Sequence, residues 1–178
     1  MERPIRLVSV VGKKNSGKTT LLVALAAEYA RRGKIVGTLK HGTHPATLDH
    51  EGTDTWRHMH EGSAQRALLE SAGQRVLFQR LDEEADPVTL ARQYMSGTDI
   101  VLAEGFTTHS IPKIEVFRRE EHDEPRYSPA HPSAKHWFAM VTDQVDVDYP
   151  FPTFRFSDTS WLVNLSKMAW DKAMIIEG

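Results

Sequence analysis

Short apolar runs alternate with stretches of helical periodicity along the first part of the chain. Residues 7–11 (LVSVV) form a mostly apolar run that predicts a buried strand. Apolar side chains then recur at helical spacing, at Leu21, Leu22, Leu25, Ala26 and Tyr29. This spacing predicts a helix over residues 18–32, with Gly33 as its left-handed terminator. A second strand is expected over residues 35–39, followed by a long polar loop over residues 40–52.

The rest of the chain carries the same two periodicities. In order, they predict a helix over residues 54–61 capped by Asp54, two strands over residues 64–70 and 75–79 about a turn at 71–73, and a helix from Asp86-Pro87 to residues 96–97. Next come an apolar strand ending at Glu104, an edge or late strand of alternating apolar and charged residues at 113–117, a strand at 137–141 and an amphipathic helix capped by Ser157-Asp158. Residues 120–136, rich in Pro, His, Ser and charge, are expected to form a surface excursion.

The turn between the first strand and the first helix fits the phosphate-binding pattern G-x-x-x-x-G-K-[ST] at residues 12–19. Its glycines let the backbone wrap an anion, so that successive N–H groups point at phosphate oxygens. Lys18 would contact the β- and γ-phosphates, Thr19 would ligate Mg²⁺, and Thr20 would lie near the α-phosphate. The residues expected to bind nucleotide here are Gly12, Lys13, Lys14, Asn15, Ser16, Gly17, Lys18, Thr19 and Thr20.

Two acids extend this site. Glu104 ends an apolar strand in the manner of a Walker B acid, which binds Mg²⁺ through water or polarises the attacking water. Gly105 would let the backbone approach the γ-phosphate, and the alternative for Glu104 is that it caps a turn. Asp49, in the loop after the second strand, is a further candidate to hold Mg²⁺ directly or through water. The catalytic candidates are therefore Lys18 and Glu104, and the metal candidates are Thr19, Asp49 and Glu104.

Asp143 follows the strand at residues 137–141, where guanine-specific P-loop proteins place the carboxylate that accepts the N1–H and N2–H groups of the base. The full N-K-x-D signature is missing, so the preference for guanine over adenine rests on Asp143 alone. The histidines from His41 to His60 include an H-x-x-H and an H-x-H. A transition-metal site there is the alternative to exposed or phosphate-contacting histidines, since catalytic zinc sites add a carboxylate or a third histidine in a defined element.

Composition narrows the class of protein. With 178 residues and 40% hydrophobic content the chain can bury a core, and we expect one nucleotide-binding domain over residues 1–178. A net charge of −2 gives no electrostatic footprint for nucleic acid, and zero cysteines exclude a disulfide framework and a thiolate zinc site. No apolar segment reads as a signal peptide or a membrane span, so no membrane association and a cytoplasmic location are expected.

Taken in order, these motifs resemble the family of molybdopterin-guanine dinucleotide biosynthesis protein B (MobB) over nearly the whole chain. Beyond the P-loop, the resemblance is carried by Leu39-Lys40-His41, Asp49, Gly52-Thr53-Asp54-Thr55, Ala103-Glu104-Gly105-Phe106, Lys113-Ile114-Glu115-Val116 and Thr142-Asp143. It implies a P-loop NTPase fold of the α/β class, with a mostly parallel sheet and helices on both faces in three layers. It also implies a GTP- and Mg²⁺-binding protein, usually a homodimer, that assists the MobA-like molybdopterin guanylyltransferase, with a molybdenum-insertion protein as a further partner.

Lys13 departs from this family pattern. A lysine directly after the first P-loop glycine matches dimeric relatives in which it reaches the partner's nucleotide, and the alternative is a solvated lysine. The segment at residues 120–136 is also longer than the family needs.

Two classes of function follow from the sequence. The first is an accessory GTP-binding protein whose bound nucleotide sets its affinity for a partner enzyme or is delivered to that enzyme, with at most slow Mg²⁺-dependent GTP hydrolysis. The second is a P-loop kinase that transfers the γ-phosphate to a small acceptor. No R-x-x-x-R lid follows the later helices, which favours the accessory GTP-binding protein.

Overall fold

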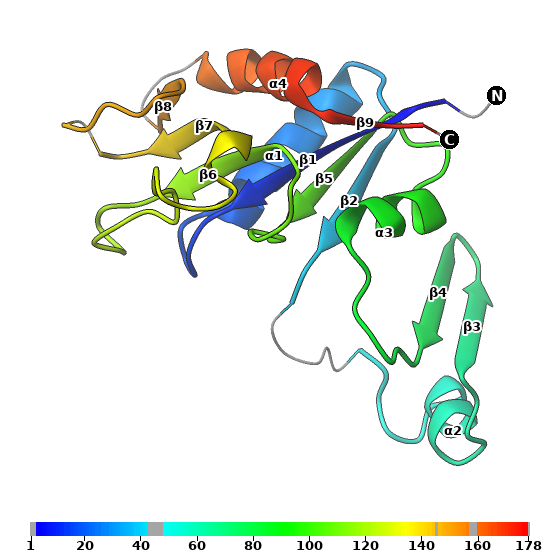
Figure 1. Cartoon of the computed structure of the whole chain (residues 1–178). Helices are drawn as coiled ribbons and strands as arrows, with labels where there is room; N and C mark the ends of the chain where they lie inside the picture. The colour runs from blue at the N-terminus through cyan, green and yellow to red at the C-terminus, as the bar shows by residue number, and fades with distance from the viewer. Residues whose placement is uncertain (1–2, 43–47, 145, 157–159, 178) are drawn as a thin grey trace. The chain divides into compact units, whose positions relative to one another are not determined.

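The computed structural model describes residues 3–42, 48–144, 146–156 and 160–177 (Figure 1). It divides into two compact units, one made of Met1–His41 with Asp86–Gly178 and the other of Gly42–Ala85. Each unit is described by itself below. The expectation of one nucleotide-binding domain over the whole chain stays a prediction.

The first unit is built on a mostly parallel sheet. Its strands are β1 (Ile5–Val11), β2 (Val36–Lys40), β5 (Ile100–Glu104), β6 (Lys113–Phe117), β7 (Trp137–Thr142), β8 (Thr153–Arg155) and β9 (Met174–Ile176). The spatial order is β2-β5-β1-β6-β7-β8, and all of these neighbours pair in parallel. The short β9, which the periodicity did not predict, pairs antiparallel with the start of β1, before β1 meets β6.

Helices cover both faces of this sheet. Helices α1 (Lys18–Arg31) and α4 (Trp161–Lys172) share one apolar cluster with Val8 and Val10 of β1, whereas α3 (Pro87–Tyr94) packs with Ile5 and Leu7 through Ala91. Because successive strand residues point to opposite faces, one buried strand feeds both clusters. The structure thus confirms the expected three-layer α/β/α arrangement (Figure 1).

Local signals set two of the helix ends. Gly33 takes φ +73° after α1, and the Asp86 carboxylate accepts the N–H groups of Val88 and Thr89 at the start of α3, both as expected. The expected cap at Ser157-Asp158 lies outside the described residues. No helix in the described segments has the length and hydrophobicity that a bilayer span requires.

The alternating pattern of β6 left an edge strand or a late strand open, and β6 is a late strand in the interior of the sheet. It lies between β1 and β7, and all five of its residues are buried, including Lys113 and Glu115. The Lys113 ammonium donates to the backbone oxygens of His109 and Ile111, and Glu115 accepts three N–H groups. Charged side chains therefore occupy the core here because loop backbone groups and an indole satisfy them.

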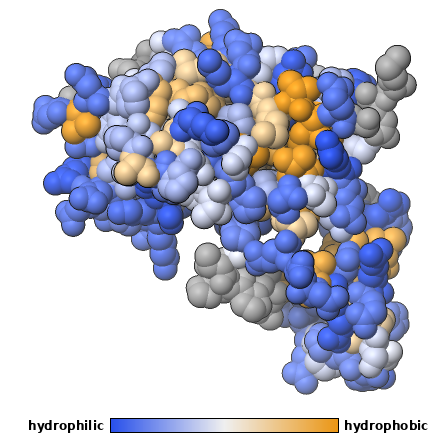
Figure 2. Space-filling view, viewed as in Figure 1, coloured by the Kyte–Doolittle hydropathy of each residue, from blue (hydrophilic) through white to orange (hydrophobic). Residues whose placement is uncertain are grey.

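The second unit holds helix α2 (Asp54–His60) and an antiparallel hairpin of β3 (Arg66–Ser71) and β4 (Gln74–Gln79). The helix cap is Thr53, whose hydroxyl accepts the N–H of Trp56, and not Asp54 as expected from the sequence. The hairpin exposes apolar side chains on both of its faces, and orange surface is visible over it in Figure 2. These side chains are Leu68, Leu69, Val76 and Leu77.

Candidate functional site

The loop at residues 12–19 connects β1 to α1 in a conformation that needs its glycines. Gly12 has φ +151° and Gly17 has φ +96°, both in the region that side chains disfavour. A Cβ atom at Gly12 would clash with the backbone oxygen of Val116 and lie 2.6 Å from Ser16 Oγ. Asn15 also takes a positive φ of 62°, as asparagine tolerates best among residues with side chains. The backbone has therefore folded into the tight turn that the motif predicts.

Lys18 folds back over this loop. Its Nζ donates to the backbone oxygen of Lys13 at 2.6 Å. Burial lowers the pKa of the Lys18 ammonium; the Glu104 carboxylate opposes the shift, and the positive charges of Arg126 and Lys40 reinforce it. The ammonium thus lies among other cations around one loop, an arrangement that a phosphate group would neutralise.

Thr19 and Glu104 come together although they lie 85 positions apart. The Thr19 hydroxyl donates to Glu104 Oε2 at 2.8 Å, and Lys40 Nζ lies 3.6 Å from Glu104 Oε1. The carboxylate therefore faces a P-loop hydroxyl and a lysine at the end of β2. A hydroxyl and a carboxylate side by side are the hard oxygen donors that Mg²⁺ accepts in nucleotide sites.

The turn after Glu104 is held against β1. Gly105 has φ +95°, its N–H donates to the Val10 oxygen at 3.0 Å, and its own oxygen accepts the Ser9 hydroxyl at 2.5 Å. A Cβ atom at Gly105 would lie 3.3 Å from the Cβ of His41, which follows β2. The glycine thus allows the ends of β1, β2 and β5 to approach one another at the P-loop.

The other P-loop positions differ in exposure. Ser16 is buried, and its Oγ has no hydrogen-bond partner among the described residues. Lys13 is half-buried, whereas Lys14, Asn15 and Thr20 are exposed. The contacts predicted for these residues with nucleotide stay predictions.

Asp143 lies at the carboxyl end of β7, as predicted. It is half-buried, and its Oδ1 accepts the backbone N–H of Arg119 at 2.7 Å. This bond orients the carboxylate from the end of β6, while Oδ2 has no hydrogen bond to the described part of the chain. The role in base recognition stays a prediction.

Asp49 lies in the second unit. Its Oδ1 accepts the hydroxyls of Thr53 at 2.6 Å and Thr55 at 3.1 Å, and its buried Oδ2 has no partner among the described residues. Its role toward Mg²⁺ stays a prediction. His44, one of the histidines of the H-x-x-H, lies outside the described residues, and the residues that are described contain no group of three or more His, Asp or Glu side chains placed to hold a metal.

The chain matches the model of a known protein family. The family model described as molybdopterin guanine dinucleotide synthesis protein B (MobB) matches residues 7–143, a range that runs from the P-loop strand to Asp143. This chain belongs to the MobB family.

Individual MobB relatives agree. The chain is 38% identical over 124 residues to a molybdopterin-guanine dinucleotide biosynthesis adapter protein of Haemophilus influenzae, a stretch that covers 67% of each protein. A probable adapter protein of Bacillus subtilis is 35% identical over 122 residues, 67% of this chain and 69% of the relative. A MobB homolog from Bacillus stearothermophilus superposes with a TM-score of 0.61 at 26% identity, over 91% of this chain and 98% of that one. The crystal structure of Bacillus subtilis MobB superposes with a TM-score of 0.70 at 22% identity, over 95% of this chain and 98% of that one, which shows that the fold is shared.

This MobB-family chain also carries site residues that sequence reasoning missed. Within the expected surface excursion, Arg126 Nε donates to the Gly12 oxygen at 3.0 Å, and His122 Nε2 lies 2.6 Å from the Lys14 oxygen. The segment therefore contacts the P-loop, more than 100 positions away. Its histidine-bearing composition marked it as unusual, but no local pattern identifies a partner at that separation.

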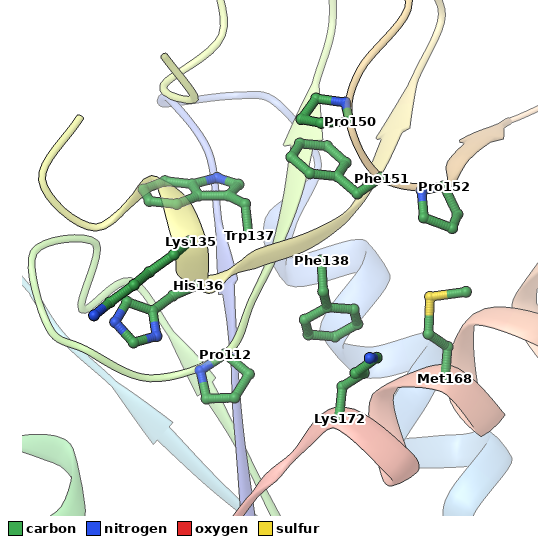
Figure 3. Close-up of a pocket in the computed structure, with 10 residues that line it drawn as sticks. All are labelled: Pro112, Lys135, His136, Trp137, Phe138, Pro150, Phe151, Pro152, Met168 and Lys172. Carbon is green, nitrogen blue, oxygen red and sulfur yellow. The ribbon is translucent and has the colours of Figure 1, made fainter. Parts of the chain in front are cut away.

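A cavity of about 560 Å³ lies at the other end of the strands (Figure 3). Its lining includes Pro112, Trp137, Phe138, Phe151, Met168 and Lys172. Pro112 precedes β6 and Trp137 begins β7, so the cavity lies at the amino ends of these strands, whereas the P-loop follows the carboxyl end of β1. In this MobB-family chain the cavity and the P-loop are separate places.

Proposed function

We propose that this chain is a GTP-binding adapter in molybdopterin guanine dinucleotide biosynthesis, which assists the guanylyltransferase that attaches GMP to molybdopterin. The observation that carries the proposal is the joining of a P-loop to an acid at the end of β5: Thr19 Oγ1 and Glu104 Oε2 lie 2.8 Å apart beside Lys18. Family membership supports the pathway, since relatives are named as adapter proteins of this biosynthesis.

The residues present fit Mg²⁺ and a triphosphate. Thr19 and Glu104 would hold the metal, directly or through water, and the metal would neutralise charge on the β- and γ-phosphate oxygens. Lys18 would leave the Lys13 oxygen for the phosphates, and the N–H groups of the loop would cradle them at the start of α1. Hydrolysis, where it occurs, is slow in this proposal.

Guanine recognition is assigned to Asp143. Its half-buried carboxylate is oriented by the Arg119 N–H and has a second oxygen for the base. A carboxylate accepts both N1–H and N2–H of guanine, and adenine has no such pair of donors on that edge. GTP and GDP are therefore the proposed ligands.

The hairpin of the second unit supports a homodimer. Leu68 and Leu77 face each other in register and are 59% and 41% exposed, although a lone two-stranded hairpin gains little stability in water. A second copy of this chain would cover such apolar surface. In the dimer, Lys13 is proposed to reach toward the partner's nucleotide, and the guanylyltransferase and a molybdenum-insertion protein are the proposed enzyme partners.

The kinase alternative receives less support. A small acceptor must lie next to the γ-phosphate, but the 560 Å³ cavity lies at the opposite end of β6 and β7 from the P-loop. An acceptor bound there could not reach a phosphate held by Lys18.

Thermal denaturation with GTP, GDP or ATP, each with Mg²⁺, tests the proposal. A ligand at 100 times its dissociation constant raises the free energy of unfolding by about 2.7 kcal/mol, which raises the melting temperature by roughly 5–10 °C for a chain of this size. We expect this rise with GTP and GDP and a smaller one with ATP. An equal melting temperature with and without every nucleotide would contradict the proposal.

A further inference from the structure

Residues 118–127, which we call the strap, follow β6 and contact the P-loop. Two of their side chains reach it: Arg126 Nε donates to the Gly12 oxygen at 3.0 Å, and His122 Nε2 lies 2.6 Å from the Lys14 oxygen. Gly12 and Lys14 are the first and third residues of the phosphate-binding motif. The strap is therefore held to the turn on which the proposed function depends.

A buried carboxylate fixes the backbone from which Arg126 projects. Glu115, in the middle of β6, accepts the N–H of Arg126 at 2.5 Å, the N–H of Tyr127 at 2.8 Å and the indole N–H of Trp137 at 3.0 Å. Burial raises the pKa of Glu115, and these N–H groups together with the Arg126 charge act against the rise. Glu115 also pairs across the sheet with Val11, the residue before the P-loop. The base of the Arg126 side chain is thus tied to the strand that presents the phosphate site.

The Arg126 guanidinium has N–H donors that make no hydrogen bond to the described residues. Of its five N–H donors, the one on Nε bonds to Gly12, and the terminal amino groups have no hydrogen bond to a described residue. Arg126 is exposed, and its charge acts on the Lys18 ammonium, as does that of Lys40. Three cations surround one loop, and Glu104 is the acid among the charges that act on Lys18. This excess of positive charge favours an anion with several oxygens, such as a di- or triphosphate.

We propose that Arg126 is a phosphate-binding residue of the nucleotide site, which donates from its terminal amino groups to the phosphate chain while Nε stays on the Gly12 oxygen. The proposal rests on the proposed function, because it names a further contact to the same ligand. Glu115 is then a positioning residue, since it holds the strap backbone through the N–H groups of Arg126 and Tyr127. The opposing interpretation is that Arg126 has only a structural role, as a staple: its hydrogen bond to the Gly12 oxygen holds the strap against the P-loop.

The test is a calorimetric titration of the full chain with GTP and, separately, with inorganic tripolyphosphate. Arg126→Gln removes the charge but leaves the backbone N–H on Glu115, and Arg126→Lys keeps the charge without the fork of donors. Arg92→Gln is the matched control, since Arg92 is an exposed arginine in the last turn of α3. We expect Arg126→Gln to weaken both ligands about tenfold or more, Arg126→Lys to weaken them less, and Arg92→Gln to bind as wild type does.

The outcomes separate this inference from the proposed function. If Arg126→Gln binds both ligands like Arg92→Gln while Lys18→Ala loses them, Arg126 is only a staple and the inference is overturned, but the nucleotide site stands. If the wild type binds tripolyphosphate but not GTP, the proposed function falls, and the tripolyphosphate series alone decides on Arg126. Binding of neither ligand overturns both. Should Arg126→Gln not fold, Arg126→Lys decides, and unchanged affinity in that variant overturns the inference.

Discussion

The variant Glu104→Gln tests whether Glu104 acts on Mg²⁺ or water at the nucleotide site or only stabilises the fold. In the wild type, Glu104 accepts the Thr19 hydroxyl at 2.8 Å and lies 3.6 Å from the exposed Lys40 ammonium. The amide of glutamine keeps the shape and can still accept from Thr19, but it loses the negative charge. A hydrogen bond to a charged group contributes about 1.5–3 kcal/mol and a neutral one about 0.5–1.5 kcal/mol, so the loss is about 1 kcal/mol. The ion pair to exposed Lys40 adds under about 1 kcal/mol.

The nucleotide-free variant should therefore melt roughly 2–8 °C below wild type, since the two losses together come to about 1–2 kcal/mol and each kcal/mol shifts the melting temperature of a domain of this size by about 2–4 °C. GDP affinity should change little because the P-loop backbone and Lys18 are untouched. GTP hydrolysis should fall about tenfold or more, since a loss of about 1.4 kcal/mol in the transition state is tenfold in rate and the carboxylate is the group that orients Mg²⁺ or water.

Three measurements on one variant check this: GDP affinity, melting temperature and single-turnover GTP hydrolysis with Mg²⁺. Glu61→Gln is the control, because Glu61 is also ion-paired, to Arg57 at 3.0 Å, but lies at the end of α2 in the second unit. A similar loss in all three measurements would refute the reasoning and make Glu104 a structural residue. Normal hydrolysis in the variant would refute it equally.

Other variants test the remaining site residues and the buried lysine. Thr19→Ala should remove most of the Mg²⁺ dependence of GTP affinity in titrations with and without the metal; an undiminished Mg²⁺ effect would exclude Thr19 as a ligand. Asp143→Asn should lower the ratio of GTP to ATP affinity by roughly one to two orders of magnitude, because an amide accepts one base donor and not two; an unmoved ratio places base recognition elsewhere. Burial lowers the pKa of Lys113 to about 8, so between pH 8 and 10.5 the unfolded chain binds the extra proton. The free energy of unfolding of the wild type should therefore rise relative to that of Lys113→Met as pH rises through this window. Denaturation measured at several pH values checks this, and a constant difference between the two proteins would contradict it.

The sequence predicted the parts of the site that local patterns encode. The P-loop, the strand ending at Glu104 and the Asp86 cap depend on neighbouring residues, and the structure has them where the patterns put them. Thr19 and Glu104 were both predicted as metal ligands although they are far apart in sequence, because ligands bind beyond the carboxyl ends of parallel strands. The structure brings the two side chains into contact.

Contacts between distant residues account for most of what the local patterns did not predict. The alternation in β6 left an edge strand open beside a late one, and it did not show that Lys113 and Glu115 are buried with partners in the strap, in β7 and in the loop before β6. The contact of the strap with the P-loop was not predicted for the surface excursion expected at residues 120–136, because the Gly12 oxygen that receives Arg126 lies 114 positions earlier. At α2, Thr53 and Asp54 are both good caps, and composition alone does not decide between neighbours.

Titration of GTP with Mg²⁺ into the wild type and into Lys18→Ala tests the central claim most directly. The Lys18 ammonium makes one hydrogen bond to the described part of the chain, to the Lys13 oxygen. Removing the side chain should therefore leave the melting temperature of the nucleotide-free protein nearly unchanged. The wild type should bind GTP with measurable heat, and Lys18→Ala should bind it at least about a hundredfold more weakly, since charge-assisted contacts of about 1.5–3 kcal/mol to the β- and γ-phosphates are lost. Equal GTP affinity in the two proteins would contradict the claim that this loop is a nucleotide site.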